Sequence, residues 1–319
     1  MKKGINYDTG FLPGQALSRK AWDPAMVARE MRVIARELHC DAVRIGGREP
    51  ARIALAAEHA AAEGLEVWFS PIPVDLDADR TLEVLADAAG RAETLRKGGA
   101  EVVLVTGCEL TAFGPGYIDG ATYLDRLTRM GAAGLDWWMG LMQVMPRFNA
   151  YLARVAATVR PLFGGPLSYA AGAWELVDWT PFDLVGVNHY RAAHNAHDYA
   201  EELRARFAAG KPVVVTEFGT CPYQGAGERG GMAWTVPEGA RRDEGEQVRY
   251  YTELMDVFER EGVAGAFWFM YAAYNRPGEA DLGSYGVVRM LDDTRWEPKE
   301  VFAAMAARNR ARTARDARS

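Results

Sequence analysis

Two glutamates stand directly after short apolar segments of the chain. Glu109 follows residues 102–106, and Glu217 follows residues 213–216. A carboxylate beside a buried apolar segment needs a partner or a task, because burial of an unpaired charge is unfavourable. Two carboxyl groups about 5 to 5.5 Å apart suit double displacement at an anomeric carbon, one as nucleophile and the other as acid and base. The pair therefore predicts acid–base and nucleophilic chemistry.

The two roles need opposite surroundings. The acid must hold its proton near neutral pH, so its environment must raise its pKa. The nucleophile must stay ionised, and a neighbouring guanidinium and phenol hydroxyl favour the ionised form. Arg44 and Tyr190, which each follow or end another apolar segment, are the candidates for this support.

Other polar and aromatic residues near the ends of apolar segments are predicted to line the same cavity. Tryptophans offer flat apolar faces to a sugar ring, whereas amides and carboxylates hydrogen-bond its hydroxyls. Glu175 is a second candidate acid if Glu109 is misplaced. The predicted substrate-binding residues are Arg44, Asn6, Asp8, Cys108, Trp174, Asn188, His189, Tyr190, Trp268 and Tyr271.

Eight short segments rich in Val, Ile and Phe alternate with longer amphipathic ones. Several are apolar at consecutive positions, as is typical of parallel strands covered on both faces. Predicted strands are residues 4–7, 42–45, 66–70, 102–106, 166–169, 184–187, 213–216 and 265–270. Predicted helices are residues 24–38, with Asp23 as N-cap and Pro24 in the first turn, and 50–63, 79–96, 146–159, 198–208, 243–261 and 298–308.

Eight β-then-α units without a break in composition predict an α/β fold, a single (β/α)₈ TIM barrel over residues 1–308. A doubly wound open sheet is the alternative, but no glycine-rich phosphate loop follows any predicted strand. Active sites of such barrels lie where the strands end at their carboxyl side. Residues 110–145 and 220–242 form long loops after strands 4 and 7, and loops of this length are usually functional.

Composition narrows the partners. The 319 residues include 37 basic and 43 acidic ones, which gives a net charge of −6. The sequence has no stripe of basic residues, so we do not predict nucleic-acid binding. No apolar run reaches the roughly 18 residues of a membrane span. An odd number of cysteines without CxxC predicts neither disulfides nor a zinc ribbon. We expect a cytoplasmic protein with a small-molecule substrate and an Arg-rich, disordered tail at residues 309–319.

Metal and thiol chemistry have weaker signals. His194 and His197 have a spacing that could ligate a metal on a helix, but no third ligand stands in a fixed relation to them. A nucleophilic Cys108 would need His189 as a base, and a small buried thiol is the commoner fate. We therefore predict neither a metal nor a cofactor.

The residues at the strand ends resemble the pattern of glycoside hydrolase clan A, whose members are retaining (β/α)₈ glycosidases. The resemblance covers nearly the whole chain as an architecture. It implies that Glu217 is the nucleophile, Glu109 the acid/base, Arg44 and Tyr190 the holders of the nucleophile, and Trp268 a platform under the sugar. The stretches INYDTGF and DEGEQ also resemble actinobacterial barrel proteins loosely labelled "abortive infection protein".

One position departs from the clan A pattern. The clan places asparagine before the acid/base, where its amide binds the substrate 2-hydroxyl, and here that residue is Cys108. A thiol is a weak donor and a weak acceptor. The sequence therefore predicts a retaining β-glycoside hydrolase or transglycosidase of a small soluble glycoside. Two alternatives stay open: a pseudoglycosidase using the carboxylates in a biosynthetic cyclase, lyase or isomerase, and a non-catalytic sugar-binding or phage-defence protein.

Overall fold

Eight parallel strands close into a barrel in the computed structural model, which describes residues 1–12 and 16–316. Each strand pairs with the next, and β1 pairs with β8 through registers such as Ile5 opposite Trp268. This closure confirms the single (β/α)₈ barrel and excludes the open sheet. The strands are β1 (Lys2–Asp8), β2 (Ala42–Gly47), β3 (Glu66–Pro71), β4 (Val102–Cys108), β5 (Leu167–Ala171), β6 (Val185–Asn188), β7 (Val213–Phe218) and β8 (Gly265–Trp268).

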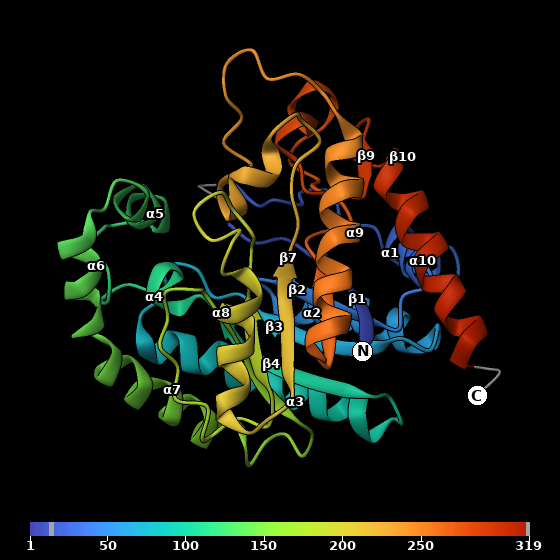
Figure 1. The fold of residues 1–319 in the computed structure, drawn as a ribbon. Helices are drawn as coiled ribbons and strands as arrows, with labels where there is room; N and C mark the ends of the chain where they lie inside the picture. Colours follow the sequence, from blue (N-terminus) through green and yellow to red (C-terminus); the bar gives the residue numbers. More distant parts are fainter. Residues whose placement is uncertain (13–15, 317–319) are drawn as a thin grey trace.

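The helices surround the barrel (Figure 1). Asp23 caps α1 by accepting a hydrogen bond from the amide of Ala25, and Pro24 opens the helix, as predicted. A helix follows each barrel strand except β5, because residues 172–184 lead from β5 to β6 without one. These helices are α1 (Pro24–Arg36), α2 (Pro50–Ala62), α3 (Ala78–Lys97), α7 (Met145–Val159), α8 (Tyr199–Ala205), α9 (Glu244–Glu261) and α10 (Glu300–Asp316).

Strand alternation divides the apolar residues into two cores. On β4, Val103 and Val105 pack inside the barrel, whereas Val102 and Leu104 pack between the barrel and its helices. This follows from the two-residue period of a strand, which turns successive side chains to opposite faces. The interior also holds Trp68 and Phe267, so the barrel is filled below the site.

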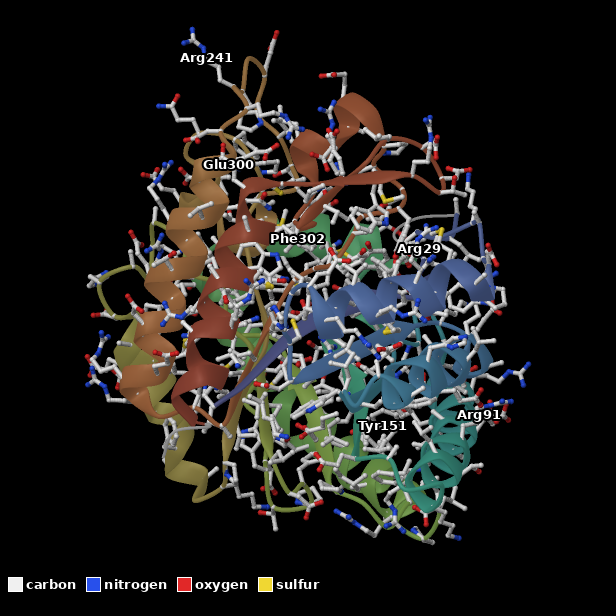
Figure 2. The ribbon with its side chains drawn as sticks, turned by 90° about the vertical axis from the view of Figure 1, so that its right-hand side faces the viewer. Arg29, Arg91, Tyr151, Arg241, Glu300 and Phe302 are labelled. Atoms are coloured by element: carbon white, nitrogen blue, oxygen red, sulfur yellow. The ribbon has the colours of Figure 1, made fainter. Side chains whose placement is uncertain are left out.

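The two long loops predicted after strands 4 and 7 are confirmed. The first contains three helices that the sequence reading treated as loop, α4 (Leu110–Phe113), α5 (Tyr123–Gly131) and α6 (Leu135–Met142). The second contains the short 3₁₀ turns η2 (Ala226–Glu228) and η3 (Gly230–Met232). The second loop lies at the top of Figure 1, on the side to which β7 points, and α5 and α6 of the first loop lie at its left. Arg241 of the second loop projects from the top of Figure 2. Their position is that of the active-site face in barrels of this kind.

The C-terminal segment differs from the expected disordered tail. Helix α10 continues to Asp316, and Asn309 is only 1% exposed. The Nζ of Lys3 donates to the Asn309 carbonyl, and the Asn309 amide donates to the carbonyl of Leu38. These contacts hold the helix against the end of the barrel where the strands begin. The last residues of the expected tail, 317–319, lie outside the described residues.

Two further elements were not predicted. Strands β9 (Val288–Met290) and β10 (Trp296–Pro298) form a short antiparallel hairpin, and η4 (Gly278–Gly283) precedes it. Within residues 1–12 and 16–316, no helix combines the length and the apolar character needed to cross a membrane.

Candidate active site

An irregularity in β7 turns Glu217 toward the barrel axis. Val214 packs inside the barrel and Val215 outside, so strict alternation would direct Glu217 outward. The register with β6 and β8 shifts within this stretch, and Phe218 packs outside the barrel again. A bulge of this kind re-aims a side chain and is common next to active sites. The Glu217 carboxylate therefore reaches the cavity.

A second irregularity places Glu109. The register between β4 and β5 shifts between Val105 and Cys108, and Gly107 within it has a φ of 120°. A Cβ at Gly107 would lie 2.8 Å from Cδ1 of Leu110, so only glycine fits there. Glu109 itself has φ 44° and ψ 46°, a left-handed conformation that costs a residue with a side chain about 1 to 2 kcal/mol. Such strain is typical of functional positions.

The Glu217 carboxylate is held on both oxygens. Oε1 accepts from Nη1 of Arg44 at 2.6 Å, and Oε2 accepts from the Tyr190 hydroxyl at 2.9 Å. The Cys108 thiol also lies 3.5 Å from Oε1. Arg44 and Tyr190 therefore hold the Glu217 carboxyl group in one orientation.

Arg44 is fixed by residues that do not contact the carboxylate. Its Nε donates to the hydroxyl of Ser70, and its Nη1 donates to Oδ1 of Asn6. The Asn6 amide in turn donates to the backbone carbonyl of Thr216 at 2.9 Å. Asn6 therefore joins β1, β2 and β7 and sets the position of Arg44. This is a positioning task beyond the substrate contact that the sequence suggested.

Glu109 has a different environment. The Asn188 amide donates to its Oε1 at 2.8 Å and lies 3.4 Å from the Cys108 sulfur, and the Thr216 hydroxyl donates to Oδ1 of Asn188. Burial, followed by the negative charge of Glu217, raises the pKa of Glu109 to about 8. Glu109 therefore keeps its proton near neutral pH.

Glu175 supports this arrangement from below. Its buried carboxylate accepts from the amide and hydroxyl of Thr111, the hydroxyl of Tyr169 and the amide of Gly172. Thr111 belongs to α4, which begins directly after Glu109. Glu175 thus anchors the start of α4, and its oxygens are occupied by protein donors. The predicted substrate contact Trp174 donates its indole N–H to the Thr111 hydroxyl and belongs to the same network.

Both glutamates line one cavity of about 70 Å³. Phe11, Ile72, Phe113 and Phe269 are half-buried and give the cavity apolar walls. Asp8 lines it from the end of β1 and is 5% exposed. The full lining is Asn6, Tyr7, Asp8, Phe11, Arg44, Gly46, Ile72, Cys108, Glu109, Phe113, Glu217, Phe269 and Met270.

Of the ten predicted substrate contacts, four line this cavity: Asn6, Asp8, Arg44 and Cys108. Asn188 and Tyr190 contact the two glutamates from outside the lining, and Trp174 contacts Thr111. The other three lie away from the cavity, contrary to the prediction. Trp268 is fully buried outside the barrel, with its ring 5.8 Å from that of Tyr251 on α9. Tyr271 is buried against Tyr7 and Trp296. His189 stacks on Tyr199, and burial lowers its pKa to about 4, so the ring is neutral near pH 7.

Alternation explains the first of these corrections. Phe267 points into the barrel, so Trp268 points out and Phe269 reaches the cavity. Alternation of side chains along residues 265–269 of the sequence could have predicted that Phe269 forms an aromatic wall of the cavity. Alternation from the inward-facing Trp68 could also have predicted that Ser70, the partner of Arg44, faces inward. No local signal in the sequence marks Ile72 or Met270 as cavity-lining residues.

No metal centre is apparent in this part of the molecule. Among residues 1–12 and 16–316, no three or more His, Cys, Asp or Glu side chains form a group that could hold a metal ion. His197 pairs with Asp198 on the surface instead.

Solved glycosidase structures share this architecture. A GH113 β-1,4-mannanase superposes with a TM-score of 0.66 at 14% identity, covering 97% of this chain and 98% of that chain. A GH113 β-mannanase from Alicyclobacillus acidocaldarius gives 0.66 at 18%, with 97% and 96% covered. The β-glucuronidase of Ruminococcus gnavus gives a TM-score of 0.60 at 15% identity, with 97% of this chain and 49% of that chain covered. No protein-family model and no curated protein matches the sequence.

These similarities establish the fold. The chain has a (β/α)₈ barrel, the fold of these solved glycosidases. At 14 to 18% identity, the comparisons carry no substrate or mechanism to this chain.

Proposed function

We propose that this protein is a retaining β-glycoside hydrolase or transglycosidase that acts on a small soluble glycoside. One observation carries the proposal: a single cavity is lined by a carboxylate held by an arginine and a tyrosine, and by a second carboxyl group whose pKa is raised to about 8. A positioned nucleophile and an acid that keeps its proton are what the double-displacement reaction requires.

The proposed reaction has two steps. In the first, Glu109 gives its proton to the glycosidic oxygen while Glu217 attacks the anomeric carbon, so the leaving alcohol departs and a glycosyl ester forms on Glu217. In the second, ionised Glu109 takes a proton from water or another alcohol, which displaces Glu217 and restores the protonated acid. Arg44 and Tyr190 orient the nucleophile in both steps.

Asn188 and Cys108 form a short path between the two carboxylates. The Asn188 amide contacts Glu109 and Cys108, and the Cys108 sulfur contacts Glu217. A separation of about 5 to 5.5 Å between the two carboxyl groups would favour the proposed retaining mechanism, and about 6.5 to 9.5 Å would favour an inverting one. With its amide engaged by Glu109 and Thr216, Asn188 is poorly placed to take over the role of the absent clan A asparagine.

Azide rescue tests the proposal. Glu217→Ala should abolish turnover of an activated aryl β-glycoside, and azide should restore it with a glycosyl azide of inverted configuration, because azide occupies the space of the lost carboxylate. Glu58→Ala, an exposed glutamate on α2, is the control and should keep normal activity. Retained activity in Glu217→Ala, or azide products without inversion, would contradict the assignment.

The narrow cavity favours a second candidate, non-hydrolytic acid–base chemistry by the same carboxylates. About 70 Å³ is well below the 300 to 1,000 Å³ of common ligand pockets. A compact biosynthetic intermediate that isomerises or cyclises by proton transfer would need less room than a disaccharide. Under this candidate, aryl glycosides would not be turned over, and Glu109→Gln would abolish proton exchange into the bound intermediate.

A further inference from the structure

Asp8 lines the cavity and carries a buried carboxyl oxygen that has no hydrogen-bond partner within residues 1–12 and 16–316. Its Oδ1 accepts from the amide of Gly10 at 2.7 Å, and the Ser18 hydroxyl lies beside the carboxyl group. Its Oδ2 has no hydrogen-bond partner among the described residues, although the side chain is buried. A buried carboxylate oxygen without a donor costs free energy. The cavity thus contains an acceptor that lacks its donor.

Arg44 contributes an unused donor to the same cavity. Its Nε and Nη1 are engaged by Ser70, Asn6 and Glu217, whereas its buried Nη2 has no partner in the described part of the chain. Asp8 and Arg44 come from the neighbouring strands β1 and β2, and both line the cavity. A hydroxyl group both donates and accepts, so a ring bearing several hydroxyls matches an empty acceptor and an empty donor.

The charge of the cavity selects against anions. The guanidinium of Arg44 is already paired with Glu217, and Glu109, which keeps its proton near neutral pH, offers no positive charge to an anion. Burial is the largest influence on the pKa of the Asp8 carboxyl group and raises it. The positive charges of Arg19 and Arg52 lower this pKa by a smaller amount. Among the cavity-lining residues, Arg44 is the one positively charged side chain. No second cation in this lining could pair with a carboxylate of a ligand.

We propose that Asp8 is a specificity-determining residue that accepts a hydrogen bond from a hydroxyl of a neutral sugar ring, and that sugars bearing a carboxylate are excluded. The reaction on that sugar rests on the proposed function, whereas the recognition does not depend on turnover. Asp8 stays outside the reacting pair, since neither glutamate is among its contacts.

Binding measurements on matched sugars test the inference. Methyl β-glucoside, β-mannoside and β-galactoside are each compared with the corresponding uronate by ligand-observed NMR at neutral pH. A hydrogen bond to a charged group is worth about 1.5 to 3 kcal/mol, so at least one neutral sugar should bind about 10- to 100-fold more tightly than its uronate. This comparison needs no variant, and so no folding failure can obscure it.

Two variants then assign the preference. Asp8→Asn keeps an acceptor for the Gly10 amide but removes the charge and replaces Oδ2 with a donor. It should weaken binding of the neutral sugar about tenfold and reduce the preference for the neutral sugar over its uronate. Asp87→Asn, on the exposed face of α3, should change neither.

The outcomes separate the two proposals. Neutral sugars that bind through Asp8 without any glycoside turnover would refute the hydrolase and leave the specificity assignment standing. Turnover of uronides as fast as of neutral glycosides, or unchanged selectivity in Asp8→Asn, would refute the assignment and leave the hydrolase. Absence of binding by every sugar would overturn the assignment.

Discussion

Replacing Glu109 with Gln should stabilise the protein, and more so at higher pH. The pKa of Glu109 is about 8 in the folded chain against an ordinary value of 4.5, because burial and the charge of Glu217 oppose ionisation. A raised acid pKa means that the folded state holds its proton longer than the unfolded state. The contribution of protonated Glu109 to the free energy of unfolding is therefore complete below about pH 4.5. It is lost as the pH rises toward 8.

The size of the effect follows from that interval. The loss accumulates at about 1.4 kcal/mol per pH unit, which gives on the order of 3 kcal/mol at pH 7 and close to none at pH 4. Gln keeps a carbonyl oxygen for the Asn188 amide, so the variant removes the charge and little else. The backbone strain at Glu109 is common to both proteins and cancels in the comparison.

Urea unfolding at pH 4 and pH 7 measures the effect. Glu109→Gln should match the parent protein at pH 4 and exceed it by on the order of 3 kcal/mol at pH 7, while losing activity. Glu58→Gln is the control and should differ by less than about 0.5 kcal/mol at both values. A gain that is equal at both pH values, or a variant less stable at pH 7, would refute the picture of a buried carboxyl group opposed by Glu217.

Further outcomes test other parts of the site. With a substrate in hand, kcat/KM should fall above about pH 8 as Glu109 loses its proton, and a profile flat to pH 9.5 would contradict its role as acid. Trp268→Ala should cost about 3 to 5 kcal/mol in chemical unfolding because it empties the outer core. Phe269→Ala should raise KM with a smaller loss of stability, and the reverse pattern would place the platform at Trp268 after all. Gly107→Ala should destabilise by about 1 to 3 kcal/mol and lower kcat, since it strains the bulge before the acid.

The sequence specified the barrel itself. Eight apolar segments alternate with amphipathic ones, and each observed strand lies within two residues of its predicted bounds. Local signals predicted these elements. They are the consecutive apolar residues in the strands, and Asp23 with Pro24 at the start of α1. Strand-end positions also predicted that Glu109, Glu217, Arg44 and Tyr190 lie near one another, because the closed topology brings all strand ends to one face.

Only the tertiary structure decided which side chains share the cavity. Regular alternation sends Trp268 outward and Phe269 inward, whereas Glu217 faces inward because a register shift interrupts that alternation. Such a shift depends on how three strands pair, and no single segment encodes it. The unused oxygen of Asp8 and the different environments of the two glutamates likewise arise from residues far apart in the sequence. Residue types and strand ends are therefore local information, while direction, pairing and charge state depend on the assembled barrel.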